Sequence, residues 1–281
     1  MQQSLAGLSV GDAFGERFFG LPDVMVERIR RREVPHGPWA WTDDTAMALS
    51  IVEVLEAHGR IDGDALARLF ARRFLDQPGR GYGRAAFHLL GAIGVGEPWA
   101  PASQALFGGL GSKGNGGAMR VAPLGAFFAD DLPRVVEEAA LSARVTHAHP
   151  EGQAGAIAVA VSAALVVRGA SGEALLGGAL EHTPPGATRA GLEAAARLPF
   201  STRVEDAAAA LGSGREVLAE DTVPFALWCA ARHLESFEEA MWQTVAGLGD
   251  RDTTCAIVGG IVALRSLPPA KFVRLREPLR W

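Results

Sequence analysis

The sequence predicts an all-α protein, and three observations favour that class. Apolar residues recur at helical spacing along most of the chain, and glycine or proline separates many of these segments. Strand signals are scarce, with one tyrosine, few runs of alternating β-branched residues and no βαβ rhythm. A chain of 281 residues can also bury one sizeable core without splitting. We therefore expect a single domain over residues 1–281, a compact orthogonal multi-helix globule with long glycine-rich loops.

Each helix is predicted from its apolar spacing and, in most cases, from a polar residue able to cap its first turn. The first, ending at Glu16, contains glycines that permit close packing against a neighbour. The next are expected at residues 42–57, 62–75, 131–143, 152–167, 172–181, 187–198, 203–211, 223–234 and 236–246. The last opens at Asp252 and is apolar on several faces as far as Leu264. Such a helix belongs at the centre of a bundle, so its N-terminus should open onto an interior cleft.

Composition excludes several classes of partner. The net charge of −5 and the pI near 5.8 leave no basic surface for duplex nucleic acid. Cys229 and Cys255 lie in apolar helical stretches without a CxxC pair, which suits a reducing cytoplasm. The chain does not open with a secretory signal pattern, and the apolar run from Ala154 to Val167 is too short to cross a bilayer. We expect a cytoplasmic protein with no membrane partner.

Two acidic clusters stand about two hundred residues apart, each at the start of an apolar helix. They are Trp41-Thr-Asp-Asp-Thr45 and Gly249-Asp-Arg-Asp-Thr-Thr254. Taken singly, each fits an ordinary helix N-cap with acidic residues in the first turn. Four carboxylates brought together would repel one another unless cations or protons neutralised them. Carboxylate and hydroxyl oxygens without thiolates suit a hard cation, so the pattern predicts a magnesium site.

A glycine-rich segment from Gly108 to Arg120 forms the next candidate site. Gly109, Gly111 and Gly114 match G-x-G-x-x-G, but no convincing strand precedes them, which weakens a dinucleotide-binding interpretation. The lysine that follows Ser112 does not complete a P-loop. Glycine nevertheless lets backbone N–H groups approach an anion closely, so a phosphate cradle of another kind stays open.

Three smaller polar features have alternative interpretations. The loop Pro78–Gly83 is a simple turn or part of a site. His147 and His149 are metal ligands, or they mark a helix start or a ligand-contacting loop, and imidazole is an unusual ligand for magnesium. Asp12 and Glu16 share one helix face, where a buried carboxyl could act as a general base or the two could form a solvated pair.

Six motifs in order carry a family resemblance. They are Gly11-Asp-Ala-Phe-Gly15, Trp41-Thr-Asp-Asp-Thr45, Arg80-Gly-Tyr-Gly83, Ser112-Lys-Gly-Asn-Gly-Gly-Ala-Met-Arg120, Thr146-His-Ala-His149 and Gly249-Asp-Arg-Asp-Thr253. Over residues 4–265 the chain resembles the ADP-ribosylglycohydrolase family, of the dinitrogenase-reductase-activating glycohydrolase type. The resemblance implies an all-α fold with a binuclear magnesium centre, in which Mn²⁺ could replace Mg²⁺, at the bottom of an ADP-ribose cleft.

The resemblance also implies roles for individual residues. The metal ligands would be Thr42, Asp43 and Asp44 on one side and Asp250, Asp252 and Thr253 on the other, with Asp252 bridging. The substrate would contact Gly111, Ser112, Gly114, Asn115, Gly116, His147 and Tyr82. Where many relatives carry a glutamate after the first aspartate, this chain has Phe19, and Glu16 is the nearest candidate for the general acid or base.

The implied reaction is magnesium-dependent hydrolysis of the glycosidic bond between ADP-ribose and an acceptor, either a protein side chain or a small N- or O-linked derivative. Asp43 or Asp44 would help by taking a proton from the attacking water. Two other functions are weighed: an ADP-ribose-binding protein without turnover, and an oxidoreductase that holds NAD on the glycine loop.

Overall fold

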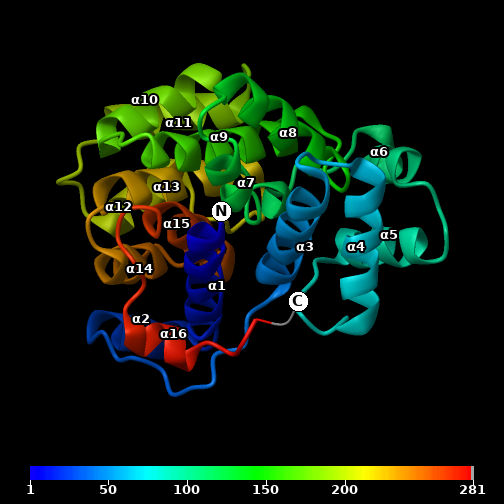
Figure 1. Ribbon diagram of the computed structural model, residues 1–281. Helices are drawn as coiled ribbons and strands as arrows, with labels where there is room; N and C mark the ends of the chain where they lie inside the picture. Colours follow the sequence, from blue (N-terminus) through cyan, green and yellow to red (C-terminus); the bar gives the residue numbers. More distant parts are fainter. Residues whose placement is uncertain (280–281) are drawn as a thin grey trace.

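The computed structural model describes residues 1–279 and consists of helices joined by loops (Figure 1). Within these residues the only β pairing is two isolated bridges, Trp39 with Arg276 and Gly114 with Leu218. The first half contains α1 (Gln2–Glu16), α2 (Pro22–Arg30), α3 (Asp43–His58), α4 (Gly63–Asp76), α5 (Arg84–Gly94), α6 (Trp99–Gly109), the 3₁₀ turn η1 (Asn115–Gly117), α7 (Ala122–Phe127) and α8 (Leu132–Arg144). The second contains α9 (Pro150–Val167), α10 (Gly172–His182), α11 (Ala187–Arg197), α12 (Val204–Leu211), α13 (Ala219–Arg232), α14 (Phe237–Ala246), α15 (Arg251–Val262) and α16 (Ala270–Leu275). The all-α prediction is confirmed.

Helix α15 lies at the centre, as its all-round apolar sequence predicts. It packs against α1, α9, α13 and α14, and nearly every one of its residues is buried. Helices α1 and α15 approach so closely that glycine is required at the contact: a Cβ on Gly11 would stand 2.0 Å from the carbonyl oxygen of Cys255. The same holds at Gly15, where a Cβ would lie 2.2 Å from the oxygen of Arg251. This pair fixes the two chain segments that carry Asp12 and Asp252.

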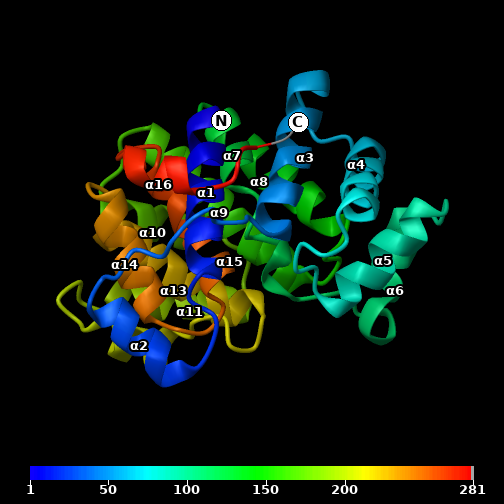
Figure 2. The same cartoon turned by 90° about the horizontal axis from the view of Figure 1, so that it is seen from below.

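Polar caps mark several of the predicted helix starts. The side chains of Thr42, Asp62, Asp131 and Ser236 each accept a backbone N–H of the helix that follows. Helices α2, α5, α6, α7 and α16 were not predicted. They are short or interrupted by glycine, and several start at proline instead of a capping side chain. Helices α4, α5 and α6 form one side of the molecule in both views (Figures 1 and 2).

Helix α9 corrects one prediction. It begins at Pro150, four residues before the apolar run at Ala154, and its 18 residues are long and apolar enough to cross a membrane by length and composition. However, 72% of that stretch is buried inside the fold, where α7, α8, α10 and α13 cover it. Its role here is that of a core helix.

The sequence of residues 274–281 predicts no more than an exposed tail or a surface patch, and residues 274–279 differ from that expectation. Instead Trp39 donates its N–H to the carbonyl of Leu275 at 2.6 Å, and Glu277 donates its N–H to the carbonyl of Trp39 at 2.8 Å. Residues 275–279, here called the C-terminal strap, therefore run beside the segment that leads into the first acidic cluster. The remaining two residues of the predicted tail lie outside the described part of the chain.

Candidate active site

A cleft of about 890 Å³ lies where the starts of α3 and α15 meet the glycine-rich loop. Its floor includes the acidic residues Asp43, Asp44, Asp250 and Asp252. Its walls come from residues 110–116, from the start of α9 and from residues 216–220. A cavity of this size falls within the range that holds a nucleotide-sized ligand. The two acidic clusters, about two hundred residues apart in the chain, thus share one site.

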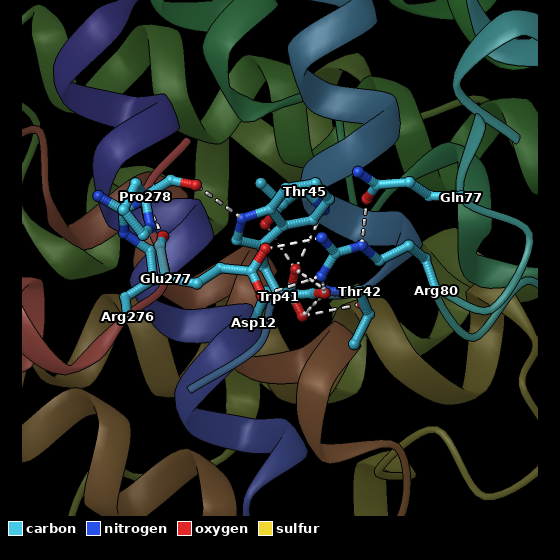
Figure 3. A network of polar contacts seen from close by, with 9 residues as sticks. All are labelled: Asp12, Trp41, Thr42, Thr45, Gln77, Arg80, Arg276, Glu277 and Pro278. Carbon is cyan, nitrogen blue, oxygen red and sulfur yellow. Dashed lines mark hydrogen bonds and ion pairs between the residues drawn. The ribbon is translucent and has the colours of Figure 1, made fainter. Parts of the chain in front are cut away.

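Asp12 anchors the first acidic cluster to α1 (Figure 3). It is fully buried, and its carboxylate accepts the N–H of Thr42 at 2.9 Å and the N–H of Thr45 at 3.1 Å. It also accepts both threonine hydroxyls. Burial raises the pKa of Asp12 to about 6, although these hydrogen bonds oppose the rise. Asp12 is therefore not half of a solvated pair; its oxygens accept hydrogen bonds from Thr42 and Thr45, and it orients the start of α3.

Arg80 holds the same cluster from the other side (Figure 3). Its backbone carbonyl accepts the N–H of Asp43 at 2.8 Å, and its guanidinium donates to the carbonyl of Trp41 at 2.9 Å while stacking 3.6 Å from the centroid of that indole. The guanidinium also makes a bidentate ion pair with Glu277 of the C-terminal strap, at 2.7 and 3.0 Å. The loop Pro78–Gly83 is thus more than a turn, because it links the strap to the acidic cluster.

The carboxylates on the floor lack enough partners to neutralise them. Burial, with Asp12 nearby, raises the pKa of Asp43 to about 7. Burial, Asp12 and Asp252 raise the pKa of Asp44 well above its usual range, and burial with Asp250 does the same for Asp252. One oxygen each of Asp44 and Asp252 is buried without a hydrogen-bond partner. Buried charges of one sign with unsatisfied oxygens are stable only when a cation or protons join them.

The donor set fits a hard divalent cation. The buried oxygens belong to carboxylates and to the hydroxyls of Thr42 and Thr253, and oxygen ligands of this kind suit Mg²⁺ or Mn²⁺. Among residues 1–279 no three His, Cys, Asp or Glu side chains converge tightly enough to hold an ion by themselves. The threonine oxygens would therefore have to complete the coordination.

The glycine-rich loop is tied to the second acidic cluster by Asn115. Its side-chain amide donates to Asp250 at 2.7 Å and to the hydroxyl of Thr222 at 3.0 Å, and its backbone N–H donates to the carbonyl of Val217 at 3.1 Å. The predicted substrate residues Gly111, Ser112, Gly114, Asn115, Gly116 and His147 all line the cleft. The structure thus brings these six together beside the carboxylates.

Two predicted site residues lie outside the cleft lining, Tyr82 and Glu16, whereas His149 lines the cleft and also caps a helix. Tyr82 is buried outside the cleft lining, with its ring edge-on to Phe74 at 5.1 Å between centroids. Glu16 lies at the exposed end of α1 and does not line the cleft. Partial burial and the carboxylate of Asp12 raise its pKa. His149 caps α9, because its Nδ1 accepts the N–H of Glu151 at 3.0 Å, which agrees with the helix-start interpretation.

Sequence reasoning assigned no role to Arg120, although it lines the cleft and is fully buried. Burial lowers the pKa of Arg120 to about 9, so the guanidinium stays charged at neutral pH, and Asp43 and Asp44 favour that charge. A signal was present, since an arginine between Met119 and Val121 interrupts an apolar stretch. Glu151 and Glu220 also line the cleft and were missed.

The fold and the site together define an all-α protein with a cleft whose floor is formed by carboxylates at the starts of two helices, α3 and α15. The family model for ADP-ribosylglycohydrolase matches residues 1–268, and the chain belongs to that family. The ADP-ribosylhydrolase ARH3 of Gallus gallus is 32% identical over 292 residues, covering 97% of this chain and 72% of the relative. The protein of the same name from Homo sapiens is 32% identical over 261 residues, covering 79% and 69%. A solved structure described as an ADP-ribosylglycohydrolase-related protein complex superposes with a TM-score of 0.72 at 27% identity, covering 98% of this chain and 90% of that one.

Proposed function

We propose that this protein is a magnesium-dependent hydrolase that cleaves the glycosidic bond between ADP-ribose and an acceptor. The observation that carries the proposal is the pair of unpartnered carboxylate oxygens, on Asp44 and Asp252, buried at the floor of a nucleotide-sized cleft. Membership of the ADP-ribosylglycohydrolase family supports the class of reaction. The names of the relatives support ADP-ribose as the part of the substrate that the cleft holds.

Six residues would hold the metal ions. Thr42, Asp43 and Asp44 stand at the start of α3, and Asp250, Asp252 and Thr253 stand at the start of α15. When bound, divalent cations would neutralise the carboxylates, orient the hydroxyls of the ribose and lower the pKa of a coordinated water. The anchors Asp12, Arg80 and Asn115 would keep these six residues in place.

The protein's own groups would supply the remaining chemistry. Asp43 or Asp44 would accept a proton from the attacking water, because both lie on the floor and neither is paired with a cationic side chain among residues 1–279. Positively charged Arg120 also lines the cleft and would favour their ionised form. The carboxylate oxygens that face the cleft would help to stabilise the positive charge that develops on the ribose in the oxocarbenium-like transition state of glycoside cleavage.

The test is release of ADP-ribose from arginine-, serine- and ester-linked substrates, with Mg²⁺ and with a chelator. We expect release to require the metal and to fall at least about 100-fold in Asp252→Asn, the scale of a lost electrostatic group in an active site. Asp206→Asn, on α12 outside the cleft, is the matched control. Substrate that binds without turnover on any linkage would favour an ADP-ribose-binding protein instead, and unchanged turnover in Asp252→Asn would contradict the assigned metal site.

A further inference from the structure

A chain of hydrogen bonds leads from Arg120 through Thr146 to His147 in the cleft wall. The guanidinium of Arg120 donates to the hydroxyl of Thr146 at 2.9 Å and to the carbonyl of Ser142 at 3.0 Å, and its plane lies over the ring of Phe70 at 4.5 Å. No carboxylate within residues 1–279 forms an ion pair with it. Because arginine only donates, the hydroxyl of Thr146 must accept from it.

Accepting that bond leaves the hydroxyl of Thr146 with one proton and a second lone pair, so the second bond is decided by where the buried proton finds an acceptor. The hydroxyl of Thr146 lies 2.7 Å from Nδ1 of His147, and this ring nitrogen is the only acceptor that the described residues offer to the hydroxyl proton. Nδ1 therefore accepts, and the ring proton of the neutral imidazole belongs on Nε2. Burial, reinforced by the charge of Arg120, lowers the pKa of His147 to about 3, which keeps the ring neutral at physiological pH.

Glycines form the socket for this ring. A Cβ on Gly116 would stand 2.8 Å from Cε1 of His147, one on Gly114 would stand 3.2 Å from Nε2, and one on Gly152 would stand 3.0 Å from Cβ of His147. Nε2 has no hydrogen-bond partner among residues 1–279, and His147 lines the cleft. Gly114 and Gly116 of the glycine-rich loop therefore leave room for the imidazole ring, and Nε2 is available to a ligand.

We propose that Arg120 and Thr146 are positioning residues that hold His147 as a neutral Nε2–H imidazole, a fixed hydrogen-bond donor to an oxygen of bound ADP-ribose. The inference rests on the proposed function, because it names a contact with that substrate. A fixed donor suits the ligand, since the diphosphate oxygens of ADP-ribose are acceptors only. An imidazole free to change tautomer would present an acceptor to them for part of the time.

The first test is spectroscopic. Long-range ¹H–¹⁵N correlation spectra separate the two nitrogens of each of the seven histidines, and His147→Gln assigns the signal of interest. We expect the Nε2–H pattern in the wild type and in Thr146→Ser, which keeps the hydroxyl, and a mixture of tautomers in Thr146→Val. A wild-type spectrum with the proton on Nδ1, or with both nitrogens protonated at pH 7, would overturn the inference without any variant.

The second test measures ADP-ribose affinity by calorimetry. We expect Thr146→Val to bind about 5- to 10-fold more weakly, the cost of one misdirected hydrogen bond, with affinity restored in Thr146→Ser. Thr244→Val is the matched control, because Thr244 is a buried threonine on α14, outside the cleft lining, whose hydroxyl donates to the carbonyl of Ala240. Wild-type affinity in Thr146→Val would refute the positioning role. If the wild type binds no ADP-ribose, the proposed function fails, and the spectra alone then decide the tautomer.

Discussion

Gly11 makes a sharp test of the packing that holds the site together. Replacing it with alanine would place a Cβ 2.0 Å from the carbonyl oxygen of Cys255 and 2.7 Å from its carbon, where ordinary contact begins at 3.4 Å. The helices would have to separate by about 1.4 Å, because both obstacles are backbone atoms of a buried helix and cannot rotate away. Alanine would gain about 1 kcal/mol of helix propensity, but overpacking of this kind costs about 3 kcal/mol or more. We expect a net loss of about 2 kcal/mol or more.

The matched control is Gly177→Ala on α10. Gly177 is also inside a helix, but a Cβ there would meet nothing within 4 Å. Only the propensity gain remains, so this variant should be more stable by about 0.5–1 kcal/mol. Urea unfolding followed by circular dichroism measures both changes. If Gly11→Ala were as stable as Gly177→Ala, the close contact between α1 and α15 would be wrong.

Two further predictions concern charge. Glu277→Gln should lower the free energy of unfolding by about 1–2 kcal/mol, because the pair with Arg80 is bidentate and its side chains are only 17% and 22% exposed. In the control Glu238→Gln, which breaks a more exposed pair, urea unfolding should show a loss below about 0.5 kcal/mol. Equal losses in the two variants would argue against a role for the strap. Burial, with Arg232 nearby, lowers the pKa of His233 to about 4, whereas an unfolded histidine takes its proton near 6.5. The unfolded state therefore binds more protons at this residue in that window, so the contribution of His233 to stability is full above pH 6.5 and falls by about 1–2 kcal/mol towards pH 4, after allowance for partial exposure. Between pH 6.5 and pH 4 the free energy of unfolding of the wild type should therefore change less favourably than that of His233→Gln by this amount, and the same pH profile in both proteins would exclude this histidine as its source.

The sequence predicted correctly those features that depend on residues close together in the chain. Threonine and aspartate caps marked the starts of α3 and α4, and the apolar character of α15 on all faces indicated its central place. Asp12 shows the opposite case. Its spacing from Glu16 suggested a shared role, yet the fold buries Asp12 under the start of α3 and leaves Glu16 exposed. The position of α3 decides which turn of α1 is covered, and the sequence of α1 does not specify that position.

The sequence by itself determined the helical class, the two acidic clusters and the family motifs, because periodicity, capping and motif order are written in neighbouring residues. Only the tertiary structure decided which groups those clusters meet. It placed the C-terminal strap on Arg80, turned Tyr82 away from the cleft lining, and linked Arg120 to His147 through Thr146. These contacts join residues up to 197 positions apart, and their geometry depends on how closely whole helices pack, which no local pattern specifies.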